Sequence, residues 1–475
     1  MRTGNKMTNQ KLTALACLSF VFAAPVASAE DTPLTPPAYA EQAIGMLGRM
    51  ISFKSVAGSD ETYPLAQYIS EELQKGGFDK SDIEVERVGD TATLVAYFRS
   101  GNDSSPILLS AHMDVVGADP ADWTRDPFTM VREDGYLFGR GAIDNKFGIA
   151  MLVTTLTRLK QEGFKPSRDL ILVLSGDEET DMATTMRLAE RFKEAEMLLN
   201  GDAGGGKIAE DGSTIAYYVQ GAEKTYADYT ISFTNPGGHS SRPRADNAIY
   251  DLAAAAQKIS MYQFPVQSSD ITLESFRMAG SQTEGALGKA MRDFAENPNN
   301  KKAINVLSAH PETIGQIRTT CVATMLDAGH APNALPQRAS MNVNCRIFPG
   351  VAPTSVEQKL LEIVDNPAAQ IELVDAVYYS DASPLREDVM AALRKAIDRR
   401  NPELPIVPIM SAGATDSLHF RARGIDSYGV AGVFMKASDE FAHGLNERVP
   451  EAAVDGALDH WHTLLTTIAD PDVSK

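Results

Sequence analysis

Short apolar runs alternate with segments of helical spacing in the first part of the chain. Residues 106–111 and 170–175 are almost wholly apolar, which is typical of strands buried on both faces of a sheet. Between them, residues 146–161 repeat apolar positions every three or four residues and so predict a helix. Residues 39–51 and 63–75 show the same spacing. This alternation predicts an α/β fold with a mostly parallel sheet and helices on both faces.

The pattern changes near residue 222. Residues 226–234 and 339–348 alternate between apolar and polar side chains, as half-exposed strands do, and residues 247–261 form an amphipathic helical pattern. The first style returns after residue 379. We therefore expect a discontinuous first domain and an α+β domain inserted into it, with these bounds: residues 30–222 and 379–475 for the first domain, and 223–378 for the inserted one. Residues 262–316 carry no clear pattern.

The N-terminus has the form of a secretory signal. Three basic residues precede a short apolar run at residues 12–24, and Ala27-Ser28-Ala29 supplies the small residues that signal peptidase requires. We expect residues 1–29 to be cleaved and the mature protein to be periplasmic or secreted. A lipid anchor at Cys17 is the lesser alternative, because Ala14 stands where lipoprotein signals carry Leu. The apolar run is too short to span a bilayer, so we expect no membrane anchoring.

Charge narrows the range of partners. The chain has 475 residues with 63 acidic and 44 basic side chains, and a net charge of -19. Such a charge repels phosphate backbones and anionic membranes, so nucleic acid is excluded as a partner. The net negative charge is more simply explained by solubility than by electrostatic steering of a ligand.

Two cysteines, Cys321 and Cys345, remain in an oxidising compartment. If a turn around Asn333 joins their strands, antiparallel pairing sets them opposite each other, and a disulfide can form. The alternative is a pair of buried thiols.

Five short motifs carry the candidate chemistry, and four of them follow apolar strands or precede a helix. His112 and Asp114 share one face after the first strand, and a carboxylate beside an imidazole fixes its tautomer for metal binding. Asp144 ends a glycine-rich turn before a helix, where a capping role is the alternative. Asp202 follows another apolar strand. His443 lies in the returning part of the first domain.

Adjacent carboxylates at residues 177–179 follow the second buried strand. They repel one another unless a cation lies nearby, although an acidic helix N-terminus would also account for them. Neighbouring side chains diverge, so Glu178 and Glu179 suit two roles, one as a metal ligand and the other as a base. Two histidines and several carboxylates at strand ends can build two adjacent metal sites, which suit zinc, with cobalt or manganese as alternatives.

On these motifs, the chain resembles the dinuclear zinc amidohydrolases that include aminoacylase, carnosinase-type dipeptidases, carboxypeptidase G and succinyl-diaminopimelate desuccinylase. The resemblance covers nearly all of the mature chain and implies two Zn²⁺ per subunit. It implies that Asp144 bridges the metals, with His112 and Asp202 on one, and Glu179 and His443 on the other. It makes Glu178 the general base and gives Asp114 the role of orienting His112. It also implies a cis peptide bond between Asp144 and Asn145.

The inserted domain resembles the lid and dimerisation domain of the same family. The resemblance implies a homodimer in which His239, within residues 237–243, reaches the neighbouring active site and stabilises an oxyanion. Asn333 and Arg346 match groups that hold a substrate carboxylate, a task that suits the planar fork of arginine. Gly413 and Thr415 match a substrate-facing turn, although Ala412-Gly413 stands where relatives often have two glycines. Without the resemblance, Arg346 could be a surface residue and His239 part of a turn.

The expected function is hydrolysis of an amide bond in a small substrate with a free carboxylate, such as a dipeptide or an N-acyl amino acid. Glu178 would take a proton from water and return it to the leaving amine. The sequence does not decide between a peptidase and an N-acyl amino acid deacylase. An ester or carbamate hydrolase with the same metal site is a further alternative. A periplasmic solute-binding protein is the alternative from another class, but it has no need of the second glutamate in Glu178-Glu179.

Overall fold

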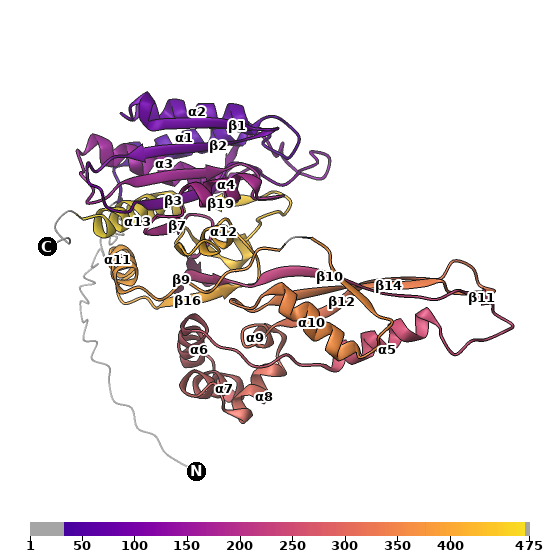
Figure 1. Cartoon of the computed structure of the whole chain (residues 1–475). Coiled ribbons are helices and arrows are strands. Elements are labelled where there is room, and N and C mark those ends of the chain that lie inside the picture. Colours follow the sequence, from indigo (N-terminus) through magenta and orange to yellow (C-terminus); the bar gives the residue numbers. More distant parts are fainter. Residues whose placement is uncertain (1–32, 376, 471–475) are drawn as a thin grey trace, which may run out of the picture. The chain divides into compact units, whose positions relative to one another are not determined.

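The computed structural model describes residues 33–375 and 377–470 (Figure 1). The predicted signal, residues 1–29, lies outside the described residues. Residues Leu34–Lys475 form one compact unit. The short apolar strands build a ten-stranded sheet in the order β1-β2-β6-β3-β7-β17-β9-β8-β18, with β16 beside β9. Its strands are β1 (Ile83–Val88), β2 (Thr91–Phe98), β3 (Ile107–His112), β6 (Leu170–Ser175), β7 (Met197–Asn200), β8 (Gly205–Ile208), β9 (Thr214–Glu223), β16 (Ile406–Ser411), β17 (Asp426–Gly429) and β18 (Phe434–Lys436).

Parallel pairing dominates the centre of this sheet. β3 is parallel to both of its neighbours, β6 and β7, and β7 is parallel to β17. Antiparallel pairs occur at β1 with β2, β2 with β6, β8 with β9, and β9 with β17. The predicted mostly parallel sheet is therefore confirmed, with antiparallel pairs on both sides of its parallel centre.

Helices cover both faces of the sheet, as predicted. Leu108 packs into one apolar core and Leu109 into another, because successive side chains of β3 point to opposite faces. One face carries α1 (Pro37–Ile51), α2 (Thr62–Lys75), α3 (Lys146–Gln161), α11 (Glu387–Asp398) and α13 (Ala453–Ile468). The other carries α4 (Ala183–Arg191) and α12 (Ser417–Arg421). Within the described ranges, no helix is both long and apolar enough for a membrane span.

A second, wholly antiparallel sheet has the order β12-β14-β10-β15. Its strands are β10 (Thr225–Thr234), β12 (Thr320–Ala328), β14 (Arg338–Ile347) and β15 (Gln370–Leu373). Alternate side chains of β14 are buried, and they pack with α5 (Ala248–Met261) and α10 (Pro353–Val364) into a separate core. The side chain of Asn247 caps α5 by accepting a hydrogen bond from the backbone N–H of Ile249. The α+β pattern predicted for this region therefore matches the structure.

The segment without a clear sequence pattern consists of short helices. They are α6 (Asp270–Gln282), α7 (Gly285–Glu296), α8 (Lys301–Ser308) and α9 (Pro311–Ile314). A small apolar core of their own, around Phe276 and Phe294, holds them together. The remaining elements are β4 (Val131–Glu133), β5 (Tyr136–Phe138), β11 (Gly238–His239), β13 (Ala334–Leu335), β19 (Arg448–Pro450), and the 3₁₀ turns at Lys80–Asp82 and Ala437–Asp439.

The chain changes sheets between Glu223, which ends β9, and Thr225, which begins β10. It rejoins the first sheet at β16, after β15 has ended at Leu373. The two sheets thus follow the predicted bounds closely. The division into a domain and an insert stays a prediction, because residues 34–475 form a single compact unit.

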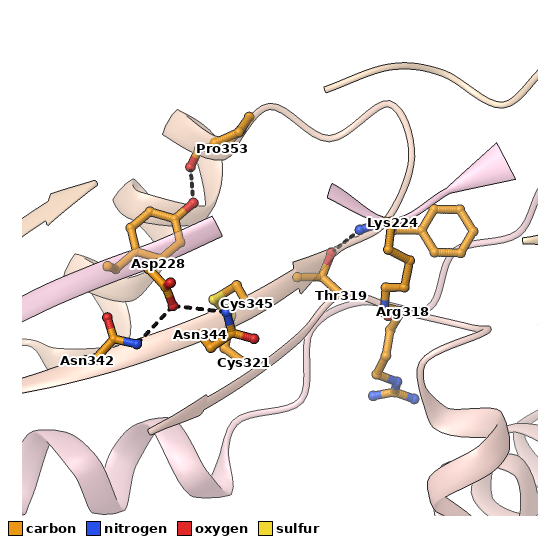
Figure 2. Close-up of a disulfide and its surroundings, with 11 residues drawn as sticks. Lys224, Asp228, Arg318, Thr319, Cys321, Asn342, Asn344, Cys345 and Pro353 are labelled. Carbon is orange, nitrogen blue, oxygen red and sulfur yellow. Dashed lines mark hydrogen bonds between the residues drawn. A yellow bond between two sulfur atoms is a disulfide. The ribbon is translucent and has the colours of Figure 1, made fainter. Parts of the chain in front are cut away.

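Cys321 and Cys345 form a disulfide across β12 and β14 (Figure 2). Their Cα atoms lie 4.1 Å apart, and the two residues are directly opposite each other in the sheet. Antiparallel pairing centred on Asn333 predicts Cys321 opposite Cys345, and this prediction is confirmed. Between Ala323 and Met325 the register shifts, so residues farther along β12 pair with other residues of β14 than the prediction gives. The alternative of two buried thiols is therefore wrong.

Candidate metal centre

Three neighbouring parallel strands deliver polar side chains to one edge of the first sheet. His112 is the last residue of β3, residues 176–179 follow β6, and Asp202 follows β7. Because β6, β3 and β7 are adjacent and parallel, their carboxyl ends meet at the same place. The order of strands in the sheet therefore accounts for the meeting of residues that are far apart in sequence.

Asp144 reaches the same place from the turn before α3. The peptide bond between Asp144 and Asn145 is cis, as the resemblance implied. The capping alternative for Asp144 is wrong, because Asn145 occupies the N-cap position of α3. The acidic helix N-terminus holds for Asp177 alone, whose Oδ1 accepts a hydrogen bond from the backbone N–H of Thr184, in the first turn of α4, at 3.1 Å. No such bond within the described residues joins Glu178 or Glu179 to α4; their backbone N–H groups donate to Asp114.

The two carboxylate oxygens of Asp144 face different histidines. Oδ1 lies 2.9 Å from His112 Nε2, and Oδ2 lies 3.0 Å from His443 Nε2. Asp202 Oδ1 lies 3.5 Å from the same nitrogen of His112. On the other side, Glu179 Oε2 lies 3.0 Å from His443 Nε2. Asp144 is thus shared by two clusters, one with His112 and Asp202 and the other with Glu179 and His443.

These donors suit a pair of divalent cations. In each cluster, the ligand atoms lie within 4.8 Å of one another. Donors bound to one tetrahedral zinc ion at about 2.0–2.2 Å are separated by about 3.4 Å, which is close to the distances found here. A further possible set combines His112, Glu178 and Glu179. The structure therefore brings all five predicted ligands together, while their binding of metal stays a prediction.

Asp114 links this centre to the glutamate pair. Its Oδ1 and Oδ2 accept hydrogen bonds from the backbone N–H groups of Glu178, at 3.1 Å, and Glu179, at 2.9 Å. Nδ1 of His112 lies 3.1 Å from the carbonyl oxygen of Asp114 and 3.4 Å from its Oδ1. The predicted contact with His112 is present, and Asp114 also fixes the turn that carries both glutamates.

Electrostatics in this cluster favour bound cations. Burial raises the pKa of Glu178 to about 10, and the neighbouring charge of Asp202 contributes. Burial also raises the pKa of Glu179 to about 7, with a contribution from Asp144. Although burial favours a neutral ring, the surrounding carboxylates, Asp202 above all, raise the pKa of His112 well above its ordinary value. Several carboxylates thus lie close together in a buried place, and nearby positive charge is needed to keep them ionised.

A buried ion pair holds the backbone of Asp144. Glu447 Oε1 accepts hydrogen bonds from the N–H groups of Ile143 and Asp144, at 2.9 and 3.1 Å. Its Oε2 accepts one from Arg140 Nη1 at 2.6 Å, and Arg140 Nη2 donates to the carbonyl of His443. We assigned no role to these residues from the sequence, although both lie in the motifs that supply Asp144 and His443.

A cavity of about 690 Å³ is lined by four of the five candidate ligands, Asp144, Glu179, Asp202 and His443. Glu178 lines it as well, together with apolar side chains. Gly413 and Thr415 also line it, as predicted for the substrate-facing turn. The Thr415 hydroxyl donates to the buried Glu223 at 2.6 Å, which fixes the turn, and its contact with a substrate stays a prediction. The apolar lining consists of Ile143, Met182, Ala414, Ala431, Val433, Met435 and Ala442.

The three site residues predicted in the inserted region, His239, Asn333 and Arg346, are not among the described residues that line this cavity. Only Arg346 lies in the second sheet, whereas His239 belongs to the short β11-β13 pair and Asn333 directly precedes β13. Arg346 comes nearest, because its Nη1 donates to the carbonyl of Ala412, beside the substrate-facing turn, at 2.6 Å. Asn333 and His239 lie together, since the Asn333 carbonyl accepts a hydrogen bond from the N–H of Ser240. His239 is exposed and follows the far end of β10. Within one chain, none of these three residues lines the cavity, and their roles in binding a substrate stay predictions.

Comparison with known proteins identifies relatives over most of the chain. The model for peptidase family M20/M25/M40 matches residues 108–467. The N-fatty-acyl-amino acid synthase/hydrolase PM20D1 of Xenopus tropicalis is 27% identical over 400 residues, covering 80% of this chain and 75% of that protein. A probable succinyl-diaminopimelate desuccinylase of Staphylococcus aureus is 27% identical over 382 residues, covering 78% of this chain and 86% of that protein.

Solved structures share the fold. An M20 family metallo-carboxypeptidase from Sulfolobus solfataricus aligns with a TM-score of 0.65 at 19% identity, covering 90% of this chain and 99% of that one. A dinuclear metal-binding M20 peptidase from Bacillus subtilis aligns with a TM-score of 0.58 at 15% identity, covering 92% and 99%. Human carnosine dipeptidase 1 aligns with a TM-score of 0.59 at 14% identity, covering 91% and 98%.

Proposed function

Since this chain belongs to peptidase family M20/M25/M40 and is a metal-dependent hydrolase, we propose that it hydrolyses the amide bond of N-acyl amino acids. The observation that carries this proposal is the shared carboxylate of Asp144, with Glu178 beside it in a cavity with apolar walls. The PM20D1 relatives support the acyl group over a second amino acid, because their name specifies N-fatty-acyl amino acids. The peptidases among the solved structures share less than 20% identity and support the fold alone.

We propose two Zn²⁺ per subunit, with cobalt or manganese as alternatives. His112, Asp144 and Asp202 would hold one ion, and Asp144, Glu179 and His443 the other. When bound, such ions supply Lewis acidity, which lowers the pKa of a water molecule toward neutrality and polarises the substrate carbonyl. The donor set fits them, because imidazole nitrogens and carboxylate oxygens are ordinary zinc ligands.

Glu178 moves the proton. Its carboxylate takes a proton from the attacking water, the hydroxyl group adds to the amide carbon, and the carbon–nitrogen bond breaks as Glu178 returns the proton to the amine. The products are a fatty or shorter carboxylic acid and a free amino acid. Asp114 keeps Glu178 in place through the backbone N–H bond described above. The position of Glu178 in the cavity wall supports this role.

Three residues of the inserted region would complete the site. Arg346 and Asn333 hold the substrate carboxylate, together with the turn at Gly413, and His239 stabilises the developing oxyanion. His239 and the neighbouring Asn333 would act on the cavity of a second subunit, because both lie outside the cavity of their own chain. We therefore propose a homodimer in which each active site uses both chains.

β12 is the surface we propose for this association. It is an edge strand of the second sheet, and it exposes the side chains of Val322, Met325 and Leu326 to 57%, 72% and 66%. Exposed edge strands with apolar side chains readily pair with another chain. Export to the periplasm or the medium is likewise a proposal, which the sequence of residues 1–29 supports.

A substrate panel tests the proposed activity. The purified, zinc-loaded enzyme is assayed on N-acetyl, N-octanoyl and N-oleoyl amino acids, on dipeptides, and on acyl esters, with Glu178→Gln as the control for contaminating hydrolases. We expect the highest kcat/KM on N-acyl amino acids. Preference for dipeptides or esters would overturn the acyl assignment. Tight binding without any turnover would instead favour the solute-binding alternative.

A further inference from the structure

A second cavity adjoins the one lined by the candidate metal ligands. It has a volume of about 320 Å³ and shares Gly204, Val433 and Met435 with the first cavity as common walls. Ser411 lines the first cavity, and its neighbours on β16, Met410 and Ile409, line the second. The two hollows therefore lie next to each other along β16, β18 and the start of β8.

The walls of this second cavity suit a hydrocarbon. Tyr218, Ile409, Met410, Val433 and Met435 supply aromatic and aliphatic surface. Met435 is almost fully buried, at 8% exposure, whereas Met410 also packs with Ala222, Ile271 and Phe348 in a separate apolar core. Methionine adapts to irregular apolar ligands because its unbranched side chain has several rotatable bonds and a polarisable sulfur.

The charged groups of this cavity lie at its exposed side. Lys207 and Glu440 line it and face each other, with 3.7 Å between Nζ and Oε1. Their side chains are 48% and 52% exposed, so they belong to the solvent rim. The second cavity thus extends from the walls that it shares with the first cavity, Gly204, Val433 and Met435, toward a charged rim at the surface.

We propose that this second cavity binds the distal methylene groups of the substrate's acyl chain. The inference rests on the proposed function: the scissile amide lies beside Glu178 in the first cavity, and the chain passes Val433 and Met435 into the second. The ligand class is an unbranched medium or long acyl chain. Selectivity then depends on chain length, because each buried methylene adds apolar contact only while the second cavity has room for it.

A chain-length series tests this assignment. N-acyl phenylalanines from acetyl to oleoyl are compared in kcat/KM, and their Kd is measured by calorimetry on zinc-loaded Glu178→Gln, which does not require turnover. We expect a gain of about fourfold per methylene while the second cavity fills, followed by a plateau. The absence of any gain beyond the length that fills the first cavity would overturn the proposal.

Substitutions of residues that line the second cavity test whether the dependence on chain length arises there. Ile409→Trp fills the cavity and should lower kcat/KM for the dodecanoyl substrate at least tenfold more than for the acetyl substrate. Ile409→Phe is a milder variant with a smaller effect in the same direction. Ile215→Trp is the matched control, because Ile215 lies on β9, as Tyr218 does, but is 50% exposed and does not line the cavity. Equal effects on both chain lengths would place the acyl chain elsewhere.

Different results would contradict the proposed function and the acyl-chain cavity. If no N-acyl amino acid of any length is hydrolysed, the proposed function is wrong, while the calorimetric series on Glu178→Gln still reports whether the cavity binds acyl chains. If all lengths are hydrolysed with equal efficiency, the function stands and the acyl cavity is wrong.

Discussion

Arg140 and Glu447 form an ion pair with 2.6 Å between Nη1 and Oε2, and their side chains are only 3% and 0% exposed. The pair joins the turn that carries Asp144 to the loop that carries His443. These two residues are the positioning groups of the metal centre, since they contact the backbones of ligands and not their side chains.

Loss of this pair should loosen the metal centre. Glu447→Gln removes the charge that faces the buried Arg140, and we expect metal affinity to fall about 10–100-fold, as for other groups that orient ligands. A competition titration with a zinc chelator measures the affinity. Glu451→Gln is the control, because Glu451 pairs with the partly exposed Arg132 at the surface. Unchanged affinity in Glu447→Gln would show that the pair has only a structural role.

Metal content should depend on which ligand is lost. His443→Ala removes a donor from one cluster and should leave the other ion bound, whereas Asp144→Asn weakens both positions because both clusters share Asp144. Elemental analysis after dialysis gives the number of ions per chain. Asp181→Asn, at an exposed carboxylate close to Glu179 in sequence, should retain the full content. Equal losses in His443→Ala and Asp144→Asn would contradict a shared ligand.

Removal of the general base should separate turnover from metal binding. Glu178→Gln keeps the size of the side chain but cannot accept the proton, so we expect turnover to fall by roughly 10²–10⁴-fold. Elemental analysis and thermal unfolding should match those of the wild type. Loss of zinc from this variant would show that Glu178 is a ligand, in line with its possible set with His112 and Glu179, and the roles of the two glutamates would be reversed.

The disulfide should contribute to stability. Chemical unfolding of a Cys321→Ala/Cys345→Ala variant should show a free energy of unfolding about 2–4 kcal/mol below that of the wild type, because the bond restricts the unfolded chain. The mature wild-type protein, denatured without reductant, should have no titratable thiol. Two reactive thiols per chain would rule out the bond in solution.

Mixed dimers test whether His239 acts across the interface. We expect Glu178→Ala and His239→Ala to be inactive alone, whereas a hybrid dimer has one site with both groups intact. Random pairing should restore about a quarter of wild-type activity under two-fold symmetry. The mixture is prepared by co-expression, and hybrids are verified with two affinity tags. Activity no higher than that of the separate variants, in a sample rich in hybrids, would show that His239 serves its own chain or none.

Local sequence patterns are sufficient to predict the strands and the helix that carry the candidate metal ligands. The strands before His112 and Glu178 are short apolar runs, and such runs have few alternatives other than a buried strand. The helix at residues 146–161 was predicted with the bounds that α3 has. Because ligands collect at the carboxyl ends of parallel strands, the motifs could be placed together before any contact was known.

Contacts between distant residues could not be predicted in the same way. Glu447 binds the backbone of Asp144 across 303 residues, and no local pattern encodes that pairing. The same holds for the buried Asp416, which accepts hydrogen bonds from Ser175 and Thr185 behind the glutamate turn. The helices α6–α9 were missed for another reason, since their core is small and few of their positions are buried.

The shared carboxylate also ties both clusters to the last segment of the chain. One cluster draws its candidate ligands from the chain up to Asp202, whereas the other needs His443. Because Glu447, which follows His443, holds the backbone of Asp144, and because β17 pairs with the strand that precedes Asp202, the first cluster depends on late residues as well. A chain that stops short of these residues therefore lacks the support of both positions, and the two should form together as folding finishes.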